Sequence, residues 1–274
     1  MSAKVYSFKA SAEITRLFPK KYLGQHFLID PNIKRKIIEA CAFQPHETIL
    51  EIGPGFGILT EAIAPHVKSI IAIETDKRLC EELKKKFTQS NVTILPADFL
   101  KYPLVSLPRH LKVIGNLPYY ISTPIVERVI MNRDYFDSLY ATLQYEFGQR
   151  LTAKTGSKEY GALSCFVQYH MDVTMLFKIK NTAFRPIPKV DSCFLKLARK
   201  AGGSPKANDE KLLFTIIHYA FQQRRKTIVN ALSKLKTPHH LKRIFTTAGI
   251  PEKARAENLT LEDYVRVTNE WEKS

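Results

Sequence analysis

The stretch Thr48-Ile-Leu-Glu-Ile-Gly-Pro-Gly-Phe-Gly57 joins a short apolar run to a glycine-rich loop, and a helical pattern over 58–64 follows it directly. Gly53 and Gly55 allow a tight turn and let a ligand approach the backbone closely. The loop has the form Gly-x-Gly-x-Gly, which differs from the Gly-x-Gly-x-x-Gly of dinucleotide binders and disfavours an NAD-linked dehydrogenase. The stretch predicts a strand, a ligand-binding turn and a helix; a purely structural turn is the alternative.

The same alternation continues on both sides of this stretch. Residues 48–52, 69–73, 92–95 and 112–114 are predicted to form buried strands, and 58–64, 78–87 and 121–131 have helical spacing. Strands over 172–179 and 192–198 could form an antiparallel pair. The alternation indicates an α/β fold in which helices cover both faces of a largely parallel sheet.

The chain is expected to have two domains. The small, polar stretch 199–208 is typical of a linker. After it, the apolar positions of 212–221, 228–235, 241–248 and 261–267 all have helical spacing, which predicts a smaller all-helical unit. We therefore divide the chain into an α/β domain over 1–198, a linker over 199–208 and a smaller helical domain over 209–274.

Charge and composition restrict the function classes. The chain has 274 residues with 42 Lys and Arg against 26 Asp and Glu, a net charge of +16 that is spread over both predicted domains. Such a basic surface favours a polyanionic partner. No apolar run is long enough for a membrane span and the N-terminus lacks a signal-peptide core, so we expect a soluble cytoplasmic protein. The scattered Cys41, Cys80, Cys165 and Cys193 predict small buried side chains and no metal site.

Two carboxylates follow the glycine loop at successive strand ends. Glu74 ends the second predicted strand, where a carboxylate can accept hydrogen bonds from both ribose hydroxyls of an adenosine. Asp98 ends the third, where it can meet an adenine amino group, and Phe99 beside it can cover the ring. Ligands of open α/β sheets bind at these carboxyl ends, so the set predicts a nucleoside site. Glu51 has no ribose contact to make and could simply brace the loop.

Asn116-Leu-Pro-Tyr119 follows the fourth predicted strand. Pro118 favours an extended conformation at Leu117, so the Asn116 side-chain oxygen and the Leu117 carbonyl can point at one external amino group. An adenine N6 is a poor nucleophile because its lone pair is delocalised into the ring, and two acceptors on its hydrogens can redirect that lone pair. Tyr119 offers a face for stacking. Transfer would be an in-line displacement driven by positioning, with the proton lost afterwards and no base required at this loop.

A target adenine inside folded RNA must leave its stack before it can react. We therefore expect a second aromatic side chain opposite Tyr119. Phe184 is the candidate, because it lies in the proline-stiffened segment 184–192 just before the last predicted strand.

The glycine loop with its carboxylates resembles the S-adenosylmethionine site of class I methyltransferases, and the whole pattern resembles one family of them. The segments 20–28, 51–60, 116–123, 184–192, 220–227 and 255–264 are similar to those of the KsgA family of small-subunit ribosomal RNA adenine dimethyltransferases. The resemblance covers nearly the whole chain from Lys20. It implies a Rossmann-like sheet and transfer of two methyl groups to N6 of each of two adjacent adenosines, in a hairpin loop near the 3′ end of that RNA.

The resemblance also implies roles for single residues. It places His26 and Leu28 at the cofactor with Gly53, Glu74, Asp98 and Asn116, and it places Tyr119 and Phe184 around the flipped adenine. His26 and Tyr120 differ from the commonest bacterial pattern, in which Asn is frequent at both positions.

Two segments are strongly basic. Residues 1–36 carry eight positive and two negative charges with aromatic residues between them. Arg224, Arg225 and Lys226 are expected to begin a helix of the second domain, and for them the resemblance implies contact with RNA phosphates. For Lys84-Lys-Lys86 a solvated helix face is the simpler interpretation.

The expected partner is small-subunit rRNA in the assembling 30S particle, bound by a monomer that uses neither DNA nor a membrane. Two alternatives stay open. One is the related large-subunit rRNA methylase of the macrolide-resistance type, and the other is a non-catalytic ribosome-assembly factor on the same fold.

Overall fold

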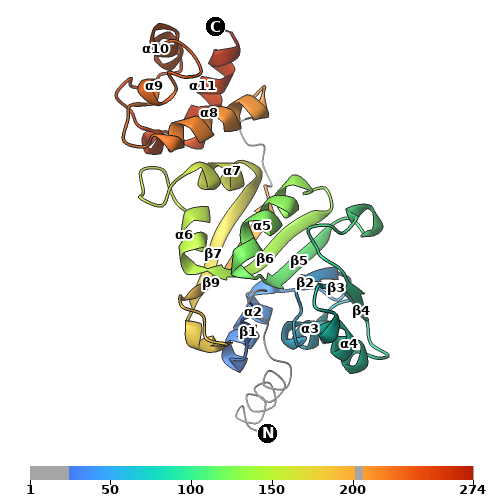
Figure 1. Cartoon of the computed structure of the whole chain (residues 1–274). Coiled ribbons are helices and arrows are strands. Elements are labelled where there is room, and N and C mark those ends of the chain that lie inside the picture. Colours follow the sequence, from blue (N-terminus) through green and yellow to red (C-terminus); the bar gives the residue numbers. More distant parts are fainter. Residues whose placement is uncertain (1–24, 201–205, 274) are drawn as a thin grey trace. The chain divides into compact units, whose positions relative to one another are not determined.

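The computed structural model describes residues 25–200 and 206–273 (Figure 1). The predicted basic segment up to residue 24 and half of the predicted linker, 201–205, lie outside the described residues. The chain forms two compact units. One runs up to Gly148 and includes Thr174–Arg199, and the other contains Gln149–Val173 and the chain from Lys200 onward.

The first unit is built on a seven-stranded sheet with the strand order β4-β3-β2-β5-β6-β9-β7. Strands β4, β3, β2, β5 and β6 run parallel to one another, and β9 is antiparallel to β6. The four strands predicted at residues 48–114 are all present, and β6 is an additional one. The strands are β2 (Thr48–Ile52), β3 (Ser69–Glu74), β4 (Val92–Pro96), β5 (Leu111–Asn116), β6 (Phe136–Gln144), β7 (Met171–Ile179) and β9 (Ser192–Arg199).

Both faces of the sheet are covered. Ile49 and Leu50 are neighbours on β2 and point to opposite faces, and neither is exposed to solvent. On one face, Ile37, Leu59 and Leu83 come from three different helices and pack with Ile49. The helices of this unit are α2 (Pro31–Cys41), α3 (Ile58–Ile63), α4 (Lys77–Lys86) and α5 (Ser122–Met131), with short 3-10 turns at Ala64–His66, Leu104–Ser106, Tyr119–Ile121 and Asn181–Ala183.

A separate two-stranded sheet joins two distant parts of the sequence. Strand β1 (Phe27–Leu28) pairs antiparallel with β8 (Phe184–Arg185), and the backbone N–H of Ile29 donates to the carbonyl of Ala183 at 2.8 Å. This pairing brings the segment around His26 beside the proline-containing loop after β8. The sequence did not predict it, because two-residue strands carry no periodicity.

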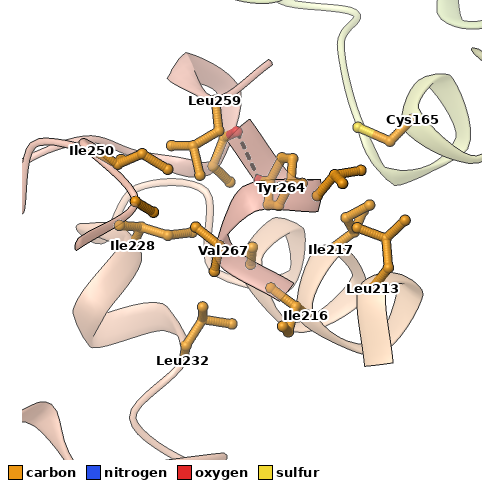
Figure 2. Close-up of a cluster of buried hydrophobic side chains, with 14 of the residues drawn as sticks. Cys165, Leu213, Ile216, Ile217, Ile228, Leu232, Ile250, Leu259, Tyr264 and Val267 are labelled. Atoms are coloured by element: carbon orange, nitrogen blue, oxygen red, sulfur yellow. Dashed lines mark hydrogen bonds between the residues drawn. The ribbon is translucent and has the colours of Figure 1, made fainter. Parts of the chain in front are cut away.

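The second unit is helical, as the sequence predicts for its C-terminal part. Figure 2 shows its core, where Leu213, Ile217 and Tyr264 pack with Cys165, and the Tyr264 hydroxyl donates to the carbonyl of Ala256 at 2.8 Å. Its elements are α7 (Ala162–His170), α8 (Glu210–Gln222), α9 (Ile228–Ala231), α10 (Pro238–Thr247), a 3-10 turn (Ala256–Asn258) and α11 (Leu261–Glu272), while α6 (Tyr145–Leu151) spans the boundary between the units.

The four cysteines are buried and unpaired, as the sequence predicts. Burial raises the pKa of Cys80 to about 11 and the pKa of Cys165 to about 12, so these thiols stay protonated and act as small apolar side chains. Within the described residues, no helix combines the length and the apolar character that a membrane crossing requires.

Candidate active site

A cavity lies at the carboxyl ends of four adjacent parallel strands. Gly53 and Gly55 follow β2, Glu74 ends β3, Asp98 follows β4 and Asn116 ends β5, and all five residues line it. His26 and Phe27, from the N-terminal part of the described chain, also line the cavity. Leu117 and Tyr119, which follow β5, line it as well. The sequence-predicted glycine loop, carboxylates and Asn-Leu-Pro-Tyr loop therefore meet in one place.

The glycine loop needs two residues without side chains. Gly53 and Gly55 have φ angles of +67° and +60°, in the left-handed region that favours glycine. A Cβ at Gly53 would meet nothing within 4 Å, so the backbone there is open to a ligand, whereas a Cβ at Gly55 would lie 2.9 Å from Cε1 of Phe27. Phe27 is a cavity residue that sequence reasoning missed. Its ring packs edge-on against Phe56, with centroids 4.5 Å apart.

The Glu74 carboxylate is held from both sides by backbone. The N–H of Gly55 donates to Oε2 at 3.1 Å, and the N–H of Asp76 donates to Oε1 at 2.9 Å. Burial raises the pKa of Glu74, and these backbone donors act against that rise. Each oxygen keeps a lone pair for a further donor, which suits a carboxylate that accepts two hydroxyl groups.

Glu51 lies under the glycine loop, and it is not among the cavity-lining residues. Only 2% of its surface is exposed, and the Thr60 hydroxyl donates to its Oε2 at 2.6 Å. Burial raises the pKa of Glu51 to about 7. Because Thr60 belongs to α3, the contact ties the end of β2 to the helix that follows the loop. This is the bracing arrangement that the sequence suggested.

The turn after β4 is held by its own backbone and by an arginine. The N–H of Leu100 donates to Asp98 Oδ1 at 2.9 Å, and Phe99 lines the cavity beside it. Arg128 of α5 lies over the Phe99 ring at 5.7 Å and donates from Nη2 to the carbonyl of Tyr102 at 2.6 Å. Arg128 was not predicted, because nothing in its local sequence indicates this contact.

The orientation of the Asn116 amide is set by a backbone partner. Its Nδ2 donates to the carbonyl of His26 at 2.6 Å, which leaves Oδ1 as an acceptor for another group. The N–H of Leu117 donates to the carbonyl of Thr142 at 3.2 Å and ties the loop to β6. Among the described residues the amide oxygen has no hydrogen-bond partner, so the amide is preset as the predicted chemistry requires.

Tyr119 is fixed at its hydroxyl end and along its ring. The hydroxyl lies 2.6 Å from the hydroxyl of Ser192, and burial raises the pKa of the phenol. The His26 imidazole stacks on the ring, with centroids 5.5 Å apart and planes 25° apart, and its Nδ1 lies 2.7 Å from the carbonyl of Pro186. The contact of the His26 side chain with cofactor, implied by the resemblance, stays a prediction.

Phe184 and Leu28 do not line the cavity. They face each other in the β1–β8 pair and belong to the core under the sheet, where Phe184 has no exposed surface and Leu28 has 4%. In this structure Phe184 is a core residue because β8 points its ring inward among Ala183 and Phe194. Its predicted stacking opposite Tyr119 would require the ring to leave that core, and this role stays a prediction, as does the cofactor contact of Leu28.

The three basic residues of the second unit lie in a turn, which corrects the expectation that they begin a helix. Arg224, Arg225 and Lys226 stand between the end of α8 and the start of α9. Arg224 is occupied within the protein, since its Nε contacts Glu257 at 3.0 Å and its Nη1 donates to the carbonyl of Lys158 at 3.0 Å. Arg225 and Lys226 are exposed.

The chain is similar to known proteins over nearly its whole length. The family "Ribosomal RNA adenine dimethylase" matches residues 18–273. The Ribosomal RNA small subunit methyltransferase A of Moorella thermoacetica is 38% identical over 266 residues, which cover 92% of each chain. A dimethyladenosine transferase of Plasmodium falciparum superposes with a TM-score of 0.79 at 26% identity, covering 90% of this chain and 98% of that one.

The 23S rRNA methyltransferase ErmE shares the fold, with a TM-score of 0.73 at 23% identity over 90% of this chain and 99% of that one. The family match and the Moorella relative both extend over nearly the whole chain. The chain belongs to the ribosomal RNA adenine dimethylase family.

Proposed function

We propose that the chain transfers methyl groups from S-adenosylmethionine to N6 of adenosines in small-subunit rRNA, and that its cavity divides into a cofactor half and a base half. The resemblance specifies two adjacent adenosines in a hairpin loop near the 3′ end, each dimethylated. The observation that carries the proposal is the preset Asn116 amide, whose Nδ2 is taken by His26 while Oδ1 faces no partner among the described contacts.

The cofactor half, defined as Gly53, Glu74 and Asp98, has the donors and the space for an adenosine. The open backbone at Gly53 can accommodate a ligand that touches the loop, and the fixed Glu74 carboxylate can accept two ribose hydroxyls. Asp98 can accept from the adenine amino group while Phe99 covers the ring. S-adenosylmethionine bound there supplies an electrophilic methyl group on a sulfonium centre.

The base half, defined as Asn116, Tyr119 and His26, positions the nucleophile. Asn116 Oδ1 and the Leu117 carbonyl accept the two hydrogens of the target N6 and turn its lone pair toward the methyl carbon. Tyr119, held by Ser192, stacks on the base. The C–N bond forms as the C–S bond breaks, and the proton leaves N6 afterwards to solvent. Fixed acceptors cost no reorganisation at the moment of reaction, so positioning and electrostatics account for the rate.

The second unit supplies phosphate contacts in this proposal. Arg225 and Lys226 are exposed and lack the protein partners that hold Arg224. RNA recognised through phosphates and shape is contacted by Lys and Arg side chains that reach the surface. Together with the overall charge of +16, the exposed pair favours a folded RNA as substrate.

The test offers methyl-labelled S-adenosylmethionine and unmethylated ribosomal subunits to the purified chain, followed by digestion of the RNA to nucleosides. We expect labelled N6,N6-dimethyladenosine in small-subunit RNA alone. Label confined to large-subunit RNA would identify a large-subunit methylase. Binding of small subunits without any label would identify an assembly factor, and either of these results would contradict the proposal.

A further inference from the structure

We infer that His26 is a positioning residue for the target adenine: its imidazole ring joins Tyr119 to the loop after β8 on the base side of the cavity. The inference rests on the proposed function and extends it. It gives the His26 ring a task different from the cofactor contact that the family resemblance implies.

The stack leaves Tyr119 one usable face. The imidazole lies nearly parallel to the phenol ring, 25° from it, at a centroid distance of 5.5 Å. With the His26 ring on one side, a base that stacks on Tyr119 must use the opposite side. The Ser192 contact at 2.6 Å already fixes the hydroxyl end of the same ring. Tyr119 is therefore held in orientation before a base arrives, which lowers the cost of ordering it during binding.

The hydrogen bond to Pro186 fixes the imidazole itself. A carbonyl oxygen only accepts, so Nδ1 of His26 must carry the hydrogen in this 2.7 Å contact. Rotation of the ring away from Tyr119 would break that bond. The contact spans 160 positions of sequence and connects the Tyr119 stack to the loop that follows β8.

That loop offers a surface suited to an unstacked nucleotide. Ile187 is 51% exposed and Val190 is 47% exposed, and the basic Lys189 between them is exposed as well. Apolar side chains beside a cation can contact a base and its phosphate together. By holding the loop at Pro186, His26 sets where this surface stands relative to Tyr119.

The backbone of His26 has a separate role, which makes the ring testable alone. Its carbonyl accepts from Asn116 Nδ2 at 2.6 Å, and a side-chain substitution leaves that carbonyl in the chain. A change at the ring therefore removes the stack or the Pro186 contact and keeps the partner of the Asn116 amide. Loss of rate in such a variant cannot be assigned to a missing Asn116 partner.

Three variants separate the two contacts of the ring. His26→Phe keeps an aromatic stack and loses the donor, His26→Asn keeps a donor and loses the stack, and His26→Ala loses both. His66→Ala is the matched control, because His66 is exposed in a 3-10 turn of the same unit and does not line the cavity. Each is assayed for single-turnover methyl transfer to unmethylated small subunits, for equilibrium binding of S-adenosylmethionine and of RNA, and for thermal unfolding.

We expect the rate of methyl transfer to fall about threefold in His26→Phe and in His26→Asn, because each loses one of the two contacts of the ring. In His26→Ala, which loses both the stack and the hydrogen bond, the rate should fall about tenfold. Affinities for S-adenosylmethionine and RNA should stay within about twofold, since phosphate contacts dominate RNA binding.

A parallel loss of cofactor affinity in the three variants would overturn the inference, because the ring would then contact cofactor. Rates within twofold of the wild type in all three would also overturn it. Absence of transfer by the wild-type chain would overturn the proposed function and this inference together, whereas an active wild type with unaffected variants overturns the inference alone.

Discussion

The two halves of the cavity are built in different ways. In the cofactor half, Glu74 accepts from Gly55 and Asp76, which are 19 and 2 positions away, and Asp98 accepts from Leu100, 2 positions away. In the base half, the contacts of Asn116, Tyr119 and His26 span 90, 73 and 160 positions. The cofactor half is thus formed by neighbouring strand ends, while the base half depends on the β1–β8 pair to bring distant segments together.

This difference implies that the halves can be damaged separately. A change in the cofactor half should lower cofactor affinity and leave the base contacts in place. A change in the base half should slow methyl transfer and leave cofactor affinity in place. Each prediction below either separates the halves or shows that they act as one.

The largest effect is expected for Glu74→Gln on cofactor affinity. Both carboxylate oxygens accept a backbone N–H, so an amide must turn its NH₂ group toward one of those donors. Loss of charge-assisted acceptors of this kind should weaken S-adenosylmethionine binding about a hundredfold. Isothermal titration calorimetry measures this affinity. At saturating cofactor, the rate of methyl transfer by the variant should recover to most of the wild-type rate. Unchanged affinity would remove Glu74 from the cofactor half.

The buried Glu51, which braces the glycine loop of the cofactor half, should make the stability of the folded chain depend on pH. Its pKa is raised from 4.5 to about 7 in the folded chain, so its contribution to stability is complete below 4.5 and is lost as the pH rises through 7. Glu51→Gln lacks this titration. The free energy of unfolding of the wild type, relative to the variant, should fall by about 3 kcal/mol between pH 4.5 and 8. Urea unfolding at several pH values measures it, and a difference independent of pH would contradict the account.

Salt should separate RNA binding from cofactor binding. Affinity for RNA should fall steeply as salt rises, because phosphate contacts release counterions, and affinity for S-adenosylmethionine should hardly change. Replacing both Arg225 and Lys226 by Ala should lower the slope of log affinity against log salt by about 2. The double replacement of Lys84 and Lys85 by Ala is the control, since both are exposed on α4. Equal slopes in the two double variants would remove Arg225 and Lys226 from the RNA contact.

The smallest effect is expected for Arg128→Met. The variant loses the bond to the Tyr102 carbonyl and the cation over Phe99, which together hold the turn that contains Asp98. Cofactor affinity should fall about threefold, the effect of one modest interaction. RNA affinity should stay unchanged in the same preparation. A larger effect on RNA than on cofactor would show that α5 serves the base half.

Prediction from the sequence succeeded for the cavity residues that stand at or just after strand ends, in both halves of the cavity. Gly53, Glu74 and Asp98 could be found because each stands at the end of an apolar run, where strand alternation fixes its place. Asn116 and Tyr119 could be found for the same reason. Strand β6 was missed because Asp137, Ser138 and Thr142 interrupt its apolar pattern, although Ser138 and Thr142 are buried.

The remaining errors concern long-range contacts. Sequence spacing cannot show that β1 and β8 pair, and so it could not show that His26 lies on Tyr119 or that Phe184 is buried in the core. The sequence predicts a helix start at Arg224, where the structure has a turn, because charged residues fit an exposed helix face equally well. The Glu257 contact that holds Arg224 joins residues 33 positions apart.

The separation of the two halves is tested most directly by Asn116→Ala, with cofactor affinity and single-turnover methyl transfer measured on one preparation. The account predicts a transfer rate about a hundredfold lower, in the range for loss of one preset polar contact to the reacting group, and cofactor affinity within about twofold of the wild type. Full activity would remove the Asn-Leu-Pro-Tyr loop from the mechanism. A loss of cofactor affinity equal to the loss of rate would show that the halves are not separate.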